Sequence, residues 1–278
     1  MKLTVLVDNN TLIDRYFYGE PGVSYFIEDN GKRILFDVGY SDAFLKNACK
    51  MNIDLLHLDY LVISHGHLDH TWGLDPLIRF FTEAEIERIK HQKPAVIAHP
   101  FTFLNKMLNG IGEIGSAISE EKLSGHFKTK LSKEPLWLTD NIVFLGEIER
   151  KNDFEAKTPM GKIIKGGVEE DDYLFDDSAL AYKSPQGLVI ITGCSHSGIC
   201  NIVEYAKKIC NENRILDIIG GFHLLNPSPK QLHGNLDYIK NLNPAEVHAC
   251  HCTDLNSRIA LSKVVNLKEV GVGLSLKY

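Results

Sequence analysis

The sequence predicts a mixed α/β fold in which helices cover layered sheets, and three features of the pattern point to it. Short apolar runs rich in β-branched residues recur along the chain, as at residues 215–219, and such runs are typical of buried strands. Amphipathic stretches, such as residues 76–91, separate several of these strands. Polar residues follow many of the strands directly, which is expected to place them at one edge of the sheets.

The first third of the chain is expected to begin as an antiparallel meander. Residues 3–7 form an apolar β-forming run, and residues 23–27 and 33–38 flank Asn30-Gly31, a strong signal for a tight turn between strands. Ser41 is the expected N-cap of a helix over residues 41–51, which leads into a buried strand at residues 60–63.

The middle of the chain is less regular. A long helix is expected at residues 76–91, a short strand at 95–98, a helix from there to about residue 108, and strand character at 137–147. Residues 109–113 and 123–135 are predicted to be irregular. Residues 147–177 have little apolar periodicity, which is typical of a disordered segment or of a functional loop over a site.

The last hundred residues return to a clear alternation of strands and helices. The expected elements are a hairpin at 178–182 and 187–192, a helix at 199–209, a strand at 215–219, a helix at 230–242 and a strand at 246–253. Because no repeat, low-complexity tract or linker divides the chain, we expect residues 1–278 to form a single domain.

Composition and charge exclude several classes of protein. The apolar fraction of 44% and the charged fraction of 24% are ordinary for a soluble globular protein. The net charge of −6 argues against nucleic acid as a partner. No apolar run is long enough to span a membrane and no signal-peptide core is present, so we expect a cytoplasmic protein without a membrane partner. The six cysteines are expected to be free thiols.

The residues that carry chemistry follow the strand at 60–63. They are His65, His67, Asp69 and His70, in the stretch His65-Gly66-His67-Leu68-Asp69-His70. Two imidazoles one residue apart on an extended loop can point at one ion, while Asp69 and His70 at the start of the next helix can point at a second position. The alternative, chance clustering among 12 histidines, does not account for this spacing.

Further candidates lie at strand ends in the second half. His196, His223 and His251 each follow an expected strand, so they can converge on the first cluster. Asp37 stands at the end of an earlier strand, where it is either a turn residue or a carboxylate that supports a ligating histidine. The cysteines that flank His251, Cys250 and Cys252, are expected to be small buried residues. His99 is left unassigned.

The stretch from His65 to His70 resembles the signature of the metallo-β-lactamase superfamily, and the resemblance extends over most of the chain. It implies a four-layer αββα sandwich with a binuclear metal site at the edge between two sheets. It also implies that His65, His67 and His196 hold one ion, that Asp69, His70 and His251 hold the other, and that Asp37 lies behind the ligands. We expect two divalent ions, with zinc favoured and manganese or iron as alternatives.

Cys194 is where the sequence departs from the superfamily pattern. Many members carry an aspartate there whose carboxylate bridges the two ions, whereas this chain has Gly193-Cys194. Three interpretations stay open. A thiolate takes the bridging place, the bridge is missing and His196 compensates, or Cys194 is a buried residue that never meets a metal.

The leading functional hypothesis is a metal-dependent hydrolase that cleaves a small anionic ester, lactone or phosphodiester with a metal-activated water. Asp69, as a ligand, and His223, as general acid or oxyanion donor, are the residues expected to take part in catalysis. The segments Gly-Cys-Ser-His-Ser-Gly and Gly-Gly-Phe-His-Leu also resemble the branch that includes ribofuranosylaminobenzene-5'-phosphate synthase. That branch implies a transferase that condenses a dihydropterin diphosphate with an aminobenzoate-phosphoribosyl substrate. A third hypothesis is a non-catalytic metal-dependent sensor.

Overall fold

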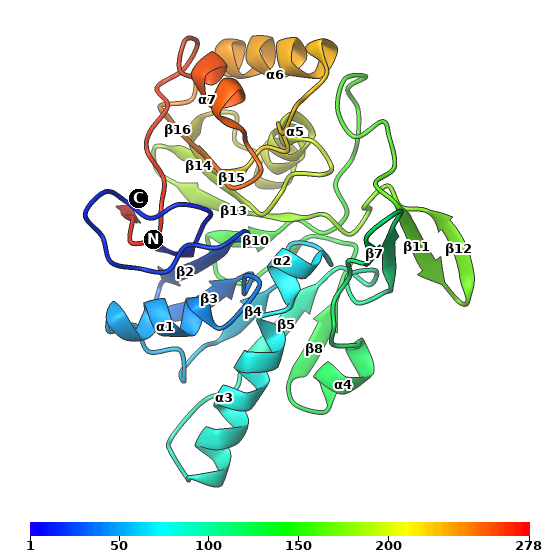
Figure 1. Cartoon of the computed structure of the whole chain (residues 1–278). Coiled ribbons are helices and arrows are strands. Elements are labelled where there is room, and N and C mark those ends of the chain that lie inside the picture. Colours follow the sequence, from blue (N-terminus) through cyan, green and yellow to red (C-terminus); the bar gives the residue numbers. More distant parts are fainter.

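Two mixed sheets pack face to face in the computed structural model, which describes residues 1–278, and helices cover their outer faces (Figure 1). The first sheet has seven strands, in the order β17 (Ser275–Lys277), β1 (Lys2–Val7), β2 (Ser24–Asp29), β3 (Lys32–Phe36), β4 (Tyr60–Val62), β5 (Ala95–Ala98) and β8 (Lys128–Leu131). The second has six, in the order β16 (Glu246–Cys250), β15 (Ile215–Gly221), β14 (Gly187–Thr192), β13 (Ala179–Ser184), β10 (Ile142–Phe144) and β9 (Leu136–Trp137).

A smaller sheet of four strands projects from one side of this pair (Figure 1). Its order is β12 (Val168–Asp171), β11 (Lys162–Lys165), β6 (Lys106–Leu108) and β7 (Gly112–Glu113). The helices are α1 (Ala43–Lys50), α2 (Leu68–Thr71), α3 (Leu74–Ile86), α4 (Glu120–Ser124), α5 (Ile199–Cys210), α6 (Pro229–Leu242) and α7 (Leu255–Leu261).

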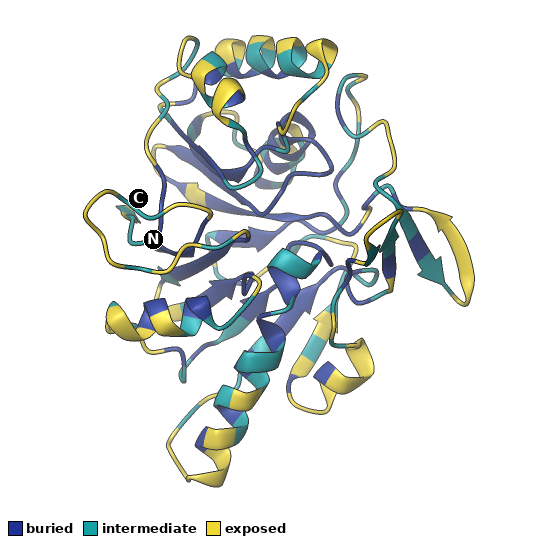
Figure 2. Cartoon of the chain, viewed as in Figure 1, coloured by how far each residue is buried: buried dark blue, intermediate teal, exposed yellow.

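Three separate apolar clusters divide the molecule into four layers. One, with 20 buried residues, joins α1 and α3 to the first sheet. A second, with 19, lies between the two sheets. A third, with 21, joins the second sheet to α5, α6 and α7. The central strands of the two large sheets are accordingly buried on both faces, while the helices keep an exposed outer side (Figure 2). This is the four-layer αββα sandwich implied by the resemblance, so the predicted fold class is confirmed.

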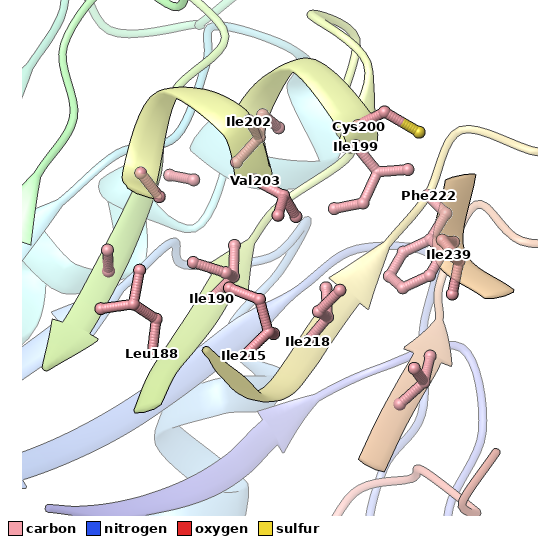
Figure 3. Packing of buried hydrophobic residues seen from close by; sticks show 14 of the residues in the cluster. Leu188, Ile190, Ile199, Cys200, Ile202, Val203, Ile215, Ile218, Phe222 and Ile239 are labelled. Atoms are coloured by element: carbon pink, nitrogen blue, oxygen red, sulfur yellow. The ribbon is translucent and has the colours of Figure 1, made fainter. Parts of the chain in front are cut away.

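Helix α5 shows how the pattern produces a layer. Its apolar residues recur at the spacing of a helix and face β14 and β15 (Figure 3). The contacting residues include Ile199, Ile202, Val203, Leu188, Ile190, Ile215 and Ile218. The helix ends at Cys210, because Asn211 turns into the left-handed region with φ 48°.

Each of the two large sheets changes from antiparallel to parallel pairing, and this change decides where loops meet. In the first sheet β1, β2 and β3 form the predicted antiparallel meander, and Asn30 (φ 48°) and Gly31 (φ 73°) make its tight turn. From β3 through β4 and β5 the pairing is parallel, as it is from β14 through β15 to β16. The loops that leave neighbouring parallel strands therefore emerge at the same edge.

Several local predictions were wrong. The helix expected up to residue 108 is absent, and a series of turns leads instead into β6. Residues 123–135 include β8, and of the two interpretations of residues 147–177 the disordered one is wrong, because they contain the hairpin of β11 and β12. The N-cap of α1 is Asp42 and not Ser41, although the Ser41 hydroxyl accepts a hydrogen bond from the Ala43 N–H at 3.1 Å and donates one to Glu20 Oε2 at 2.5 Å. In each case contacts between distant segments override the local pattern.

Two further findings concern the chain as a whole. All six cysteines are free, as predicted. None of the helices combines the length and the apolar character that crossing a membrane requires.

Candidate metal centre

His65 and His67 lie on the loop between β4 and α2, and Asp69 and His70 lie in α2 itself. His65 is fully buried and His67 nearly so, and His65 Nε2 lies 3.1 Å from His67 Nδ1. Because a zinc–nitrogen bond measures about 2.0–2.1 Å, two ring nitrogens at this separation can share one ion. Gly66 between them lets the loop pass close to the backbone of residue 102, since a Cβ atom there would stand 2.1 Å from the Thr102 carbonyl oxygen.

His196 completes a cluster of three imidazoles. Its ring centroid lies 4.7 Å from those of both His65 and His67. His196 Nε2 and His67 Nε2 are buried without a hydrogen-bond partner. Burial lowers the pKa of His67 to about 3, and it also holds the pKa values of His65 and His196 well below the ordinary range. The three rings are therefore neutral at pH 7 and can offer lone pairs to a cation.

A second group contains Asp69, His70, Cys194 and His251, whose ligand atoms all lie within 4.8 Å of one another. Asp69 Oδ2 is 3.6 Å from His70 Nε2 and 3.4 Å from His251 Nε2. Burial opposes the charged form of His70, but Asp69 and Asp37 outweigh it and raise the pKa of His70 to about 9. A divalent ion bound at Nε2 would take the place of this proton and supply the positive charge that these carboxylates attract.

The Cys194 sulfur lies between the two groups. It is 3.3 Å from His70 Nε2 and 3.1 Å from His251 Nε2, and it also falls within 4.8 Å of the ligand atoms of His65 and His196. The position is therefore compatible with a sulfur shared by two ions. Imidazole, carboxylate and thiolate groups together, with buried nitrogens that lack partners, fit divalent ions of the zinc type.

Asp37 supports this edge from the end of β3. Its Oδ2 lies 2.7 Å from His70 Nδ1, and it accepts hydrogen bonds from the backbone N–H and the hydroxyl of Ser64, both at 2.7 Å. A carboxylate behind a ligating histidine fixes the orientation of the ring and leaves the other nitrogen free for a metal. The contact expected from the resemblance is present.

A buried ion cluster that the sequence analysis missed holds the signature loop from the other side. Lys106 Nζ, 1% exposed, lies 3.0 Å from Asp172 Oδ2 and 2.9 Å from Asp176 Oδ1. Asp176 also accepts a hydrogen bond from the Gly66 N–H at 2.8 Å. No sequence signal points to this cluster, because 66 and 70 residues separate Lys106 from its partners.

Further supports, which the sequence analysis also missed, come from Asp8, Asn9 and Asp177. His251 donates its backbone N–H to Asp8 Oδ1 at 3.0 Å, and its Nδ1 lies 2.9 Å from Asn9 Oδ1. The fully buried Asp177 lies 4.0 Å from His65 Nδ1 and accepts a hydrogen bond from the Ser197 N–H at 2.8 Å. Burial raises the pKa of Asp177 to about 6.

The remaining candidates are not members of the two ligand groups, but His223 adjoins one of them. The His223 ring lies 4.2 Å from that of His196, and its Nδ1 is buried without a partner. His99 pairs with Glu147 at 3.1 Å and does not join the site. Cys250 is buried against Tyr25, as expected. Cys252 is only partly buried, and its thiol donates a hydrogen bond to the Cys194 carbonyl at 3.3 Å.

Backbone strain gathers at the same edge. Asp37, Ser195, His223 and His251 all have positive φ values, of 56°, 61°, 50° and 50°. Residues other than glycine seldom adopt this conformation, and they keep it where the surrounding structure enforces it. Four such residues beside one set of histidines are typical of a functional site.

Comparison with known proteins identifies the family. Residues 18–207 match the metallo-beta-lactamase superfamily. The chain belongs to this superfamily. An uncharacterised protein of Methanocaldococcus jannaschii is 34% identical, over 98% of both chains. From the same organism, 7,8-dihydropterin-6-methyl-4-(beta-D-ribofuranosyl)-aminobenzene-5'-phosphate synthase is 32% identical, over 91% of this chain and 87% of its own.

Solved structures of the superfamily share the fold. The crystal structure of a metal-dependent hydrolase of the beta-lactamase superfamily superposes with a TM-score of 0.83 at 29% identity, over 100% of this chain and 99% of its own. Zinc-bound PqqB from Methylobacterium extorquens has a TM-score of 0.58 at 10% identity, with 100% of both chains covered. The second likeness concerns the fold alone.

Proposed function

We propose that this member of the superfamily is a metal-dependent hydrolase that cleaves a small anionic ester, lactone or phosphodiester. The observation that carries the proposal is the pair of adjoining ligand groups, His65, His67 and His196 on one side and Asp69, His70 and His251 on the other, with the Cys194 sulfur between them. The net charge of −6 supports a small-molecule substrate over a nucleic acid.

Each part of the edge has a role in this proposal. The two groups would hold two divalent ions, with zinc favoured and manganese or iron as alternatives. Such ions lower the pKa of a water molecule and stabilise negative charge on the attacked group. The chain itself supplies orientation, through Asp37 behind His70, and a proton donor in His223, whose Nδ1 is free to donate to an oxyanion or a leaving group.

The test is hydrolysis by the purified protein, loaded separately with zinc, manganese and iron, of a panel of phosphodiesters, lactones and thioesters. We expect turnover that chelation abolishes and that added metal restores. His67→Ala is expected to lose activity, while the variant of an exposed histidine, His126→Ala, keeps it. A metal-loaded protein that turns over none of the panel would overturn the hydrolase proposal.

The 32% identity to a named synthase favours a second candidate function. In this alternative the same ligand groups serve a transferase that condenses a dihydropterin diphosphate with an aminobenzoate-phosphoribosyl substrate. Incubation of the metal-loaded protein with both compounds would then release pyrophosphate and form a coupled product, detectable by chromatography. Product that requires both substrates supports the transferase, whereas hydrolysis of either compound alone supports the leading proposal.

The place of Cys194 has its own test. We propose that its thiolate is shared by the two ions, because its sulfur lies close to both ligand groups. Cobalt-substituted protein should show a thiolate-to-metal charge-transfer band that Cys194→Ser lacks, while Cys210→Ser, at a buried thiol on α5, should retain it. If the band is absent from the wild type and Cys194→Ser still binds two ions, Cys194 is only a packing residue.

A further inference from the structure

A cavity of about 640 Å³ opens beside His196 and His223. Its walls come from three segments that are distant in the sequence: residues 153–160, Tyr173 with Leu174, and residues 228–231 at the start of α6. Small-molecule sites commonly measure about 300–1,000 Å³. The cavity is therefore large enough for the body of a small substrate whose reacting end lies at His196.

One part of the cavity wall is apolar and firmly attached. Phe154, Pro159, Met160 and Leu174 line it, and Phe154 lies directly against Gly234 of α6, where a Cβ atom would stand 2.6 Å from the ring. The neighbouring Glu155 is buried and accepts hydrogen bonds from the N–H groups at the start of α5, including that of Cys200 at 3.2 Å. The wall is thus tied to the helix that follows His196.

Another part of the wall is positively charged. Lys157 and Lys230 line it together with the start of α6, whose N-cap Ser228 accepts a hydrogen bond from the Gln231 N–H at 3.2 Å. The first turn of α6 contains no acidic residue to offset the helix dipole. Asp153 is the only carboxylate in the lining, and it pairs with Lys230 at 2.7 Å through side chains that are 82% and 64% exposed.

We propose that this cavity binds a substrate with an apolar body and a second anionic group, a phosphate or carboxylate, at the end remote from the reacting bond. Lys157 and Lys230 bind that group, and Lys230 exchanges Asp153 for it. Phe154 and Met160 contact the apolar body. The inference rests on the proposed function, because it takes the reacting end of the substrate to lie at the metal centre, beside His196.

Binding without turnover tests this inference. The probes are alkylphosphonates of increasing chain length and their ω-carboxy counterparts, titrated into the zinc-loaded full chain by calorimetry. At the chain length that reaches the lysines, we expect the ω-carboxy alkylphosphonate to bind about tenfold more tightly than the alkylphosphonate of the same length without the carboxylate. The preference should shrink as salt is added. An ω-phosphono series distinguishes a phosphate pocket from a carboxylate pocket.

Three variants test whether the preference for the ω-carboxy compounds arises in the cavity. Lys157→Gln and Lys230→Gln should each reduce it about threefold, and Asp153→Asn should increase it by a similar factor, because Lys230 is then free of its partner. Lys162→Gln is the matched control, since Lys162 pairs with Asp171 on the β11–β12 hairpin and lies outside the lining.

Equal affinity of the two series at every length, or no binding of either, would overturn the inference. So would a loss of preference in Lys162→Gln as large as that in Lys157→Gln. These outcomes are independent of catalysis. Chelator-sensitive hydrolysis without any preference for a second anion would contradict the cavity proposal and support the hydrolase proposal. A preference for a second anion without turnover would support the cavity proposal and contradict the hydrolase proposal.

Discussion

The two halves of the chain contribute to the metal centre in different ways. The first half supplies four candidate ligands within the six residues from His65 to His70. The second half supplies Cys194 and His196 after β14 and His251 after β16, with β15 between these two strands. The first set is brought together by local chain geometry. The second is brought together by parallel strand order, because loops that leave parallel strands share an edge.

The supports of the two halves also differ. Behind the first set lie buried charges, Asp37 against His70 and Lys106 between two aspartates. Behind the second set lie two buried carboxylates, Asp8 and Glu155, which accept hydrogen bonds from neutral backbone N–H groups, and a partly exposed contact between Asn9 and His251. Because a buried charge that loses its counter-charge is costly, we expect the first half, whose supports are ion pairs, to tolerate their substitution less well.

Removal of a ligand from either half should have the largest effect. If both ligand groups hold an ion, His67→Ala and His251→Ala should each lose one of two ions and reduce turnover by more than about a hundredfold. Elemental analysis and steady-state kinetics measure both quantities. A wild-type protein that holds a single tightly bound ion would contradict the prediction that each ligand group holds an ion of its own.

Removal of Lys106 should be the most destabilising change among the supports. Lys106→Ala leaves Asp172 and Asp176 buried without their cation, so we expect the free energy of unfolding to fall by about 3–5 kcal/mol. Lys162→Ala, which breaks the exposed pair with Asp171 on the neighbouring strand, should cost far less, because solvent screens that pair. Urea unfolding of the metal-free proteins compares the two, and equal losses would contradict the buried-cluster argument.

Removal of a charge behind a ligand tests the difference between the halves directly. Asp37→Asn should weaken metal binding about 10–100-fold, because the variant lacks the carboxylate that fixes the orientation of the His70 ring. Asn9→Ala should weaken it less, since the contact with His251 is partly solvated. Competition with a chromophoric chelator gives both affinities. Similar losses in the two variants would show that the halves are supported equally.

The smallest effect is expected at Glu155. Burial raises the pKa of Glu155 above its usual value of 4.5, so the unfolded chain releases this proton at lower pH than the folded protein. Stability therefore falls as the pH rises from the unfolded pKa through the folded one, and Glu155→Gln should remove that part of the dependence. Glu155→Ala should cost about 1 kcal/mol through loss of the helix cap. Urea unfolding of the wild type and of Glu155→Gln across acidic pH measures this dependence. If the free energy of unfolding changes with pH equally in both proteins, the role given to Glu155 is wrong.

The amino-acid sequence by itself determined the features that depend on neighbouring residues. Strands such as β4 and β5 and helices such as α5 and α6 follow from short-range apolar periodicity. The spacing of His65, His67, Asp69 and His70 predicted a candidate site, and the strand-to-helix positions of His196 and His251 predicted that they would join it. The structure places all of these side chains together.

Only the tertiary structure decided what depends on residues far apart in the chain. Residues 99–108 read locally as a helix, yet they lead into β6, where Lys106 meets carboxylates 66 and 70 residues away. Asp8, Asp177 and Glu155 lie in segments without a motif, and their roles follow from burial and from the backbone groups that they accept. The position of the Cys194 sulfur between two ligand groups likewise depends on how the two sheets pack, because a local sequence pattern specifies periodicity but not the partners of a buried charge.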